Sequence, residues 1–170
     1  MPIGVYRIVK VPAIRGFSLI EMLIVIVILA TVLTIAVPNF NRYIHNTNLK
    51  TAGRDLAGDI FNTKQIAAAQ AVYYKIIFDK DANNYRIIKG GPNGTSGEYD
   101  ETTAITKSLG SLAGYITIAS TTYDPPQIVF EQRGTTSAGS VTLKNDIGST
   151  IKITTSLMGR VKVSVDYVPQ

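Results

Sequence analysis

An uninterrupted apolar run from Phe17 to Val37 constrains this chain more than any other feature. The run has 21 residues, and Glu21 is its one charged residue. A helix of that length is about 31 Å long, which matches the hydrocarbon core of a bilayer. Fourteen of the residues are Leu, Ile, Val or Phe. They favour insertion by about 4–8 kcal/mol, whereas a carboxylate at the bilayer centre costs about 3 kcal/mol. The run is therefore predicted to span a membrane.

A secretory signal that is removed on export is the alternative interpretation of this run. Such signals carry only about 7–15 apolar residues, and Thr34-Ile35-Ala36 is a weak cleavage site followed closely by Pro38. We therefore expect the run to stay on the mature chain. The flanking charges do not predict which end of the run faces the cytoplasm, because three basic residues lie on each side. They are Arg7, Lys10 and Arg15 before the run and Arg42, Lys50 and Arg54 after it.

The composition of the 170-residue chain argues against an enzyme. It has no cysteine, and His45 is its one histidine. Thiolate zinc sites, cysteine nucleophiles and most histidine-based centres are thereby excluded, and we expect neither a metal nor a cofactor. His45 lies in a polar stretch and is predicted to be a solvated surface residue. The net charge of +5 falls to +2 without residues 1–15, so it is weak support for nucleic-acid binding.

The residues at the head of the apolar run form a motif, Arg15-Gly16-Phe17-Ser18-Leu19-Ile20-Glu21. With its short basic leader, the motif resembles the prepilin leader junction of type IV pilins and pseudopilins. The resemblance implies that prepilin peptidase removes residues 1–16 by cutting between Gly16 and Phe17, and then methylates the Phe17 amine. It also implies that Glu21 engages the N-terminal amine of a neighbouring subunit during assembly.

The resemblance also implies a location and partners. The protein would be a single-pass protein of the bacterial inner membrane, with its globular domain in the periplasm, and it would enter a pilus or pseudopilus. Its partners would be other pilin or pseudopilin subunits, prepilin peptidase and the inner-membrane assembly platform.

The chemistry of two motif residues agrees with these roles. Gly16 has no side chain to obstruct the backbone in a peptidase groove. Glu21 is a lone carboxylate in an apolar segment and needs a partner. The nearest cation that could serve as this partner is the α-amine freed at Phe17. The alternative for Glu21 is an interfacial residue that reaches the lipid headgroups.

Helical periodicity continues beyond Pro38, at which the helix could kink or a new helix could start. Apolar residues recur in one stripe, and the helix is predicted to reach about residue 72. A helix of some 55 residues is about 80 Å long, so its first part must protrude while the stripe packs on a sheet. Gly53 and Gly58 could serve close packing or bending. The stripe consists of Leu49, Ala52, Leu56, Ile60, Ala67 and Ala71.

Residues 73–170 have the pattern of a β-rich globular domain, so the predicted fold class is α+β, with one long N-terminal helix on antiparallel sheet. The polar segment Gly90–Glu101 is predicted to be a loop. Lys80–Asn83 is predicted to be a hairpin turn, although Asp79, Asp81 and Asn83 superficially resemble the start of a calcium loop. The predicted organisation is a leader (1–16), a transmembrane segment (17–37), an amphipathic segment (38–72) and this domain (73–170). The predicted strands are 72–79, 84–89, 115–119, 127–131, 140–143, 150–154 and 160–167.

The C-terminal pattern narrows the family. Ile128-Val129-Phe130, Arg133-Gly134, Val141-Thr142-Leu143 and Met158-Gly159-Arg160-Val161 together resemble the pattern of H-type minor pseudopilins and related minor pilins. The resemblance implies a structural minor subunit that aids filament initiation and protein secretion, in a type II secretion pseudopilus or a type IV pilus.

A DNA-binding minor pilin, active in DNA uptake by a type IV pilus, is the alternative function. Some relatives carry Gly-Arg-x-Arg near the C-terminus, where this chain has Gly159-Arg160-Val161-Lys162. Arg160 and Lys162 would then contact phosphates, although lysine cannot grip a phosphate bidentately. Otherwise the two residues decorate a strand face.

Overall fold

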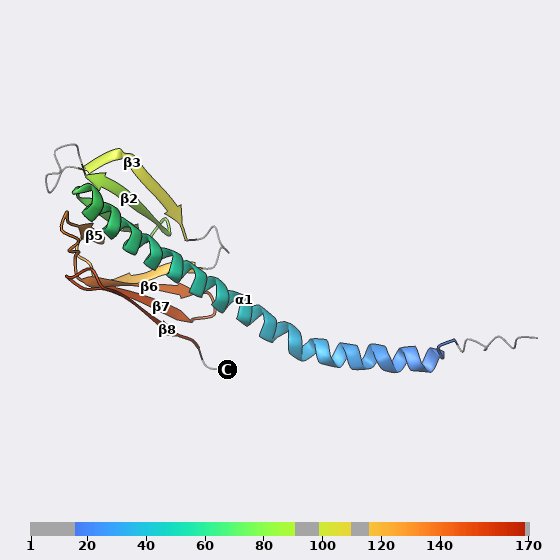
Figure 1. Cartoon of the computed structure of the whole chain (residues 1–170). Coiled ribbons are helices and arrows are strands. Elements are labelled where there is room, and N and C mark those ends of the chain that lie inside the picture. Colours follow the sequence, from blue (N-terminus) through green and yellow to red (C-terminus); the bar gives the residue numbers. More distant parts are fainter. Residues whose placement is uncertain (1–15, 91–98, 110–115, 169–170) are drawn as a thin grey trace, which may run out of the picture. The chain divides into compact units, whose positions relative to one another are not determined.

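The computed structural model describes residues 16–90, 99–109 and 116–168 (Figure 1). The chain divides into two compact units, residues 1–39 and residues 40–170. Residues 1–15 of the predicted leader and most of the predicted 90–101 loop lie outside the described residues.

The helix α1 runs from Leu19 to Gln70. It continues through position 38 without interruption, so the alternative of a separate helix that starts at Pro38 is wrong. In the second unit, five members of the predicted stripe are buried, which confirms the helical periodicity. They are Leu49, Ala52, Leu56, Ile60 and Ala67.

The sixth member of the stripe, Ala71, was predicted wrongly. It lies one residue beyond α1, is exposed, and has a φ of 51°. Its N–H bonds the carbonyl of Ala68 (3.4 Å), and the N–H of Val72 bonds the carbonyl of Ala67 (3.1 Å). This pair of bonds is the Schellman motif, which ends a helix with a left-handed residue. Periodicity alone does not show where such a stop falls.

Eight strands in the described residues form two four-stranded sheets, with the orders β3-β2-β1-β5 and β4-β6-β7-β8. Every pairing between them is antiparallel. The α+β fold class is thereby confirmed. The strands are β1 (Tyr74–Asp79), β2 (Asn84–Gly90), β3 (Tyr99–Ser108), β4 (Ile116–Thr121), β5 (Gln127–Phe130), β6 (Gly139–Asn145), β7 (Thr150–Thr155) and β8 (Val161–Asp166).

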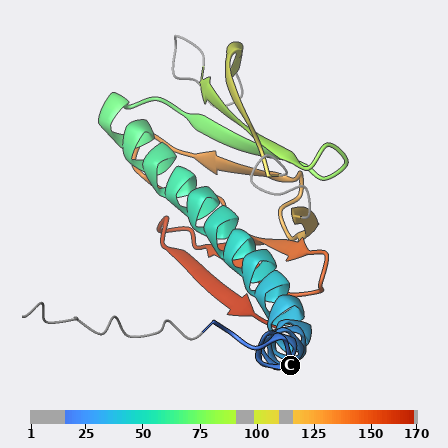
Figure 2. The same ribbon diagram turned by 90° about the vertical axis from the view of Figure 1, so that its right-hand side faces the viewer.

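The outer part of α1, from residue 40, lies over both sheets (Figures 1 and 2). On one flank of the helix, Asp59 contacts the first sheet, β3-β2-β1-β5. Its carboxylate accepts a hydrogen bond from the Tyr85 hydroxyl (2.6 Å) and forms an ion pair with Lys107 (2.7 Å). Burial of the phenol raises the pKa of Tyr85 most, and the nearby Asp59 carboxylate raises it further. The phenol therefore stays protonated and donates the hydrogen bond. On the other flank, the Lys64 ammonium donates to the carbonyls of Met158 (3.2 Å) and Gly159 (3.1 Å), beside the second sheet.

The two helix glycines differ in what surrounds them. A Cβ added to Gly53 would lie 2.4 Å from Cδ1 of Ile151, a fully buried residue of β7. A Cβ added to Gly58 would meet no atom within 4 Å. Gly53 therefore serves close packing of α1 on the second sheet, whereas Gly58 has no such contact.

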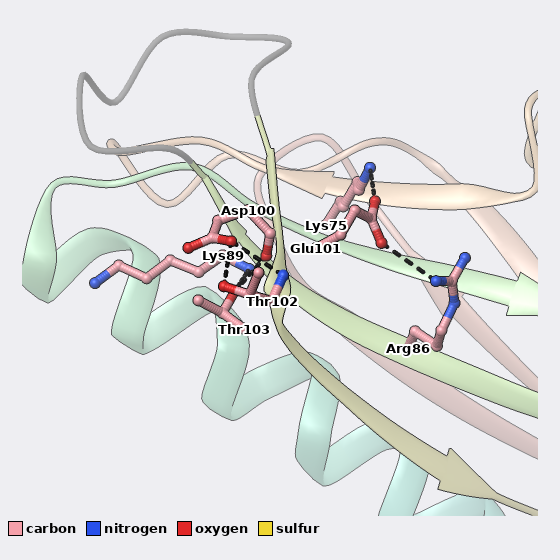
Figure 3. Close-up of polar contacts among 7 residues, drawn as sticks. All are labelled: Lys75, Arg86, Lys89, Asp100, Glu101, Thr102 and Thr103. Carbon is pink, nitrogen blue, oxygen red and sulfur yellow. Dashed lines mark hydrogen bonds and ion pairs between the residues drawn. The ribbon is translucent and has the colours of Figure 1, made fainter.

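The strand β3 is absent from the sequence prediction, which places residues 99–101 in a polar loop and has no strand between residues 89 and 115. Its sequence, YDETTAITKS, alternates poorly and is mostly exposed. Polar contacts attach it to its neighbours (Figure 3): Lys75 (3.3 Å) and Arg86 (3.2 Å) both contact the Glu101 carboxylate. The Lys89 N–H donates to Thr103 Oγ1 (3.2 Å). Such cross-strand pairs stabilise an edge strand that has little apolar surface to bury.

The first hairpin has the predicted form. Asp79 pairs with Asn84, and the Asp79 carboxylate accepts hydrogen bonds from the N–H groups of Asp81 (3.1 Å) and Ala82 (2.9 Å). The carboxylate is therefore engaged in a turn. Within the described residues, no cluster of His, Cys, Asp and Glu is arranged to hold a metal ion.

Candidate processing and assembly site

Gly16, Phe17 and Ser18 immediately precede the first residue of α1. The Ser18 carbonyl accepts the N–H groups of Glu21 (3.1 Å) and Met22 (3.2 Å), so Ser18 is the N-cap. Ser18 and Glu21 have the spacing of a capping box, and a carboxylate in the first turn stabilises the helix dipole. The start of α1 therefore follows from the same residues that form the predicted junction.

The peptide bond between Gly16 and Phe17 lies outside the helix. Phe17 is 75% exposed, and a Cβ built on Gly16 would meet no atom within 4 Å. A peptidase needs access to non-helical backbone at the bond that it cuts. The structure offers such access at this junction, and it places Glu21 within the first turn that follows.

The first unit carries an exposed apolar helix surface. The most apolar 18-residue window of α1 has a mean hydropathy of 2.8, and none of it is buried, so the helix is long and apolar enough to cross a membrane. Its two threonine hydroxyls are satisfied internally: Thr31 donates to the Ile28 carbonyl (2.7 Å) and Thr34 to the Ala30 carbonyl (2.8 Å). Both hydroxyls therefore need no water, as hydrocarbon requires. Glu21 is exposed, and no residue in the described ranges pairs with its carboxylate.

The residues singled out near the C-terminus lie on the second sheet. Arg160 immediately precedes β8 and Lys162 lies within it, and both are exposed. Because the two are separated by one residue, they lie on the same face, away from the core. The structure thus brings these two residues together, but in a different unit from Gly16, Phe17 and Glu21.

Strand pairing adds two basic residues to this face that the sequence analysis missed. Lys152 in β7 faces Ser164, and so lies diagonally next to Lys162 across the sheet. Lys144 in β6 faces Thr150, and so lies diagonally next to Lys152. All are exposed, and we call Lys144, Lys152, Lys162 and Arg160 the basic diagonal. No sequence motif marks Lys144 and Lys152, because their place beside Lys162 depends on the register of three strands.

The surface role predicted for His45 needs correction. Its Nδ1 lies 2.7 Å from an Asp146 carboxylate oxygen in the turn between β6 and β7, and its side chain is only 21% exposed. The neighbouring Asn46 accepts a hydrogen bond from Asn145 (3.1 Å). His45 thus helps to attach α1 to the second sheet, through a contact between residues about a hundred positions apart that the local polar sequence did not reveal.

An accessible junction, a helix long and apolar enough to cross a membrane, and a domain with one helix on antiparallel sheets are together the features of the type IV pilin-like class. Comparison with known families agrees. Residues 12–37 match the prokaryotic N-terminal methylation motif, and residues 54–159 match the type II transport protein GspH family. The second match covers more than half of the chain, and the chain belongs to the GspH family.

Solved structures share the fold. One is the minor pseudopilin EpsH of the Vibrio cholerae type 2 secretion system, with a TM-score of 0.56 and 8% identity, over 69% of this chain and 97% of that chain. Another is the Pseudomonas aeruginosa type IV minor pilin FimU, with a TM-score of 0.53 and 14% identity, over 72% of this chain and 92% of that chain. No curated protein matches the sequence.

Proposed function

We propose that this protein is a structural minor subunit, a minor pseudopilin or minor pilin, of a type II secretion pseudopilus or a type IV pilus. It is held in the bacterial inner membrane by residues 17–37, with its globular domain in the periplasm. Prepilin peptidase removes residues 1–16 and methylates Phe17. The subunit then joins other pilin-like subunits at the assembly platform and aids filament initiation and secretion.

The observation that carries this proposal is the position of the junction. Gly16 lies in accessible, non-helical backbone shortly before a helix whose most apolar 18-residue window is not buried at all. In an ordinary soluble protein such a surface would be buried or would cause aggregation. A bilayer before assembly and a bundle of neighbouring helices after it would both cover this surface.

Glu21 explains how one such subunit selects its position beside another. A carboxylate among apolar side chains is costly until it meets a cation. Cutting after Gly16 creates a cation at Phe17, just before the first turn of the helix that carries Glu21. A neighbouring subunit shifted along the filament can place its own Phe17 amine against this carboxylate.

We predict that Gly16→Leu blocks maturation, because a side chain at this position obstructs the peptidase groove. The expected loss in cleavage rate is on the order of 100-fold, the effect of a misplaced scissile bond. Intact-mass measurement of the full chain from cells that contain prepilin peptidase tests this prediction. The matched control is Gly4→Leu, a leader substitution away from the junction, which should be cut normally. Normal removal of residues 1–16 from Gly16→Leu would contradict the proposed cleavage site.

The basic diagonal favours DNA binding as a second candidate function. Its four cations are exposed, and Asp166 is the one acid among the strand residues of the same face. Diagonal neighbours on a sheet lie about 7–8 Å apart, so the cations form a row that can follow a phosphate backbone. The intervening side chains include Thr142, Thr154 and Ser164, whose hydroxyls can also donate to phosphates.

The second candidate predicts a particular dependence on salt. Lys152→Ala should weaken binding to duplex DNA of any sequence and lower the slope of log affinity against log salt by about 1. Lys80→Ala, in the exposed β1–β2 turn, is the control and should change neither quantity. Fluorescence anisotropy of labelled DNA with the full chain in detergent measures both. Affinity that does not fall with added salt would eliminate this candidate.

A further inference from the structure

The strand β8 is an edge whose core-facing side is incompletely covered. It pairs with β7, and no strand in the described residues pairs with its other edge. Val163 and Val165 face the same way as their fully buried partners, Ile153 and Ile151, yet each is 39% exposed. Tyr167, just beyond the strand, is 43% exposed. A further strand at this edge would extend the sheet and cover these side chains.

The backbone groups at the open edge can be assigned. The Ser156 N–H donates to the Arg160 carbonyl (3.0 Å) at the start of the β7–β8 hairpin. Hydrogen-bonded and non-hydrogen-bonded positions alternate along an antiparallel pair, so the even-numbered residues of β8 bond to β7. The N–H and C=O groups of Val163 and Val165 therefore point outward. An edge of this kind is a template for strand addition.

The sequence of β8 is complementary to itself. In an antiparallel pair of two copies with Ser164 opposite Ser164, Lys162 of each copy lies opposite Asp166 of the other. On the core-facing side, Val163 lies opposite Val165. Pairs of opposite charges and pairs of β-branched residues both stabilise strand pairing when they lie directly opposite each other. A register displaced by one residue would place one valine opposite Ser164 and the other opposite Asp166 or Lys162, and it would turn the valines of one copy to the opposite face of the joined sheet from those of the other.

We propose that β8 is a homotypic docking edge, which pairs antiparallel with β8 of a second copy of this chain about a two-fold axis at Ser164. Val163 and Val165 exchange backbone hydrogen bonds across the axis, and the two second sheets become one continuous sheet. This inference goes beyond the proposed function, because that function requires neither a second copy of the same chain nor a two-fold axis.

The direction of β8 fixes how the two copies meet. Lys64 bonds Gly159 beside the start of β8, whereas His45 pairs with Asp146 in the β6–β7 turn, beside its end. Thus β8 runs antiparallel to the outer part of α1. The two-fold axis then sets the outer parts of the two helices antiparallel. The docking edge therefore joins copies that approach from opposite directions, and side-by-side subunits of one filament do not use it.

A single cysteine tests the pairing, because the native chain has none. At the axis the two Ser164 positions form a non-hydrogen-bonded pair with Cα atoms about 4.5 Å apart, within the range of a disulfide. Full-length Ser164→Cys in detergent should therefore form a disulfide-linked dimer under mild oxidation. Lys152→Cys, on the same face but one strand from the edge, is the matched control and should link at least tenfold more slowly. Equal rates would overturn the proposal.

Charge reversal tests the register. Lys162→Glu in the Ser164→Cys background places Glu against Asp166 in both symmetric pairs, and should slow linking by roughly tenfold. Adding Asp166→Lys swaps the pair and should restore the rate. Both positions are exposed, and far-ultraviolet circular dichroism should show unchanged folding. Linking that Lys162→Glu does not slow, or that the swap does not restore, would show that β8 does not pair in this register.

Discussion

Glu21→Ala should insert into the membrane and lose its leader at the normal rate, yet be recovered in sheared filaments at least tenfold less often than the unchanged chain. Removing the carboxylate makes insertion easier, and it leaves the junction backbone before the helix unchanged. What the variant lacks is the group that meets the Phe17 amine of a neighbour. Two unit charges 4 Å apart attract by about 4 kcal/mol at an effective dielectric constant of 20. Desolvation offsets part of this attraction, but a tenfold loss needs only about 1.4 kcal/mol.

Two further variants separate charge from shape at this position. Glu21→Gln keeps the size of the side chain and removes the charge, so it should fail to assemble as Glu21→Ala does. Glu21→Asp keeps the charge on a shorter side chain and should retain part of the assembly. Intact mass verifies cleavage of all three, and immunoblotting of sheared filaments measures incorporation. Normal incorporation of Glu21→Gln would reject the ion pair and would favour the interfacial alternative for Glu21.

The features that could be predicted from sequence are those that depend on local patterns. The apolar run and the spacing of Ser18 and Glu21 fix where α1 starts, and the 3.6-residue period identified the buried face from Leu49 to Ala67. Turn residues at short intervals separated most of the strands correctly. Each of these signals lies within a few residues of the structure that it specifies.

The features that were missed depend on contacts between distant parts of the chain. β3 has no apolar alternation, and its attachment relies on Glu101 meeting Lys75 and Arg86 from two other strands. The pairing of His45 with Asp146 and the basic diagonal likewise depend on tertiary register. A single sequence gives the residue types in such cases, but it does not give the register that brings them together.

Gly53 shows how a tertiary contact decides between alternatives that the sequence left open, and it yields the largest expected effect on stability. Gly53→Leu should lower the free energy of unfolding by about 2 kcal/mol. Leucine gains roughly 1 kcal/mol of helix propensity over glycine. Its Cβ, however, would lie 2.4 Å from Cδ1 and 3.0 Å from Cγ2 of the fully buried Ile151. Overpacking of this kind costs about 1–3 kcal/mol, occasionally more, and leucine adds further atoms beyond the Cβ that have no space between α1 and β7.

Gly58→Leu is the matched control, because the substitution and the helix are the same and only the surroundings differ. Since a Cβ at position 58 meets no atom within 4 Å, this variant should gain up to about 1 kcal/mol from helix propensity alone. Urea unfolding of the full chain in detergent measures the free energy of unfolding of both variants. The circular dichroism of the tyrosines follows the transition, because the chain has no tryptophan. Gly53→Leu should therefore be less stable than the unchanged chain and Gly58→Leu more stable. The free energies of unfolding of the two variants should differ by about 3 kcal/mol. Equal stability of the two would show that α1 does not approach β7 as closely at Gly53 as the structure indicates, and that the outer part of the helix can shift on the second sheet.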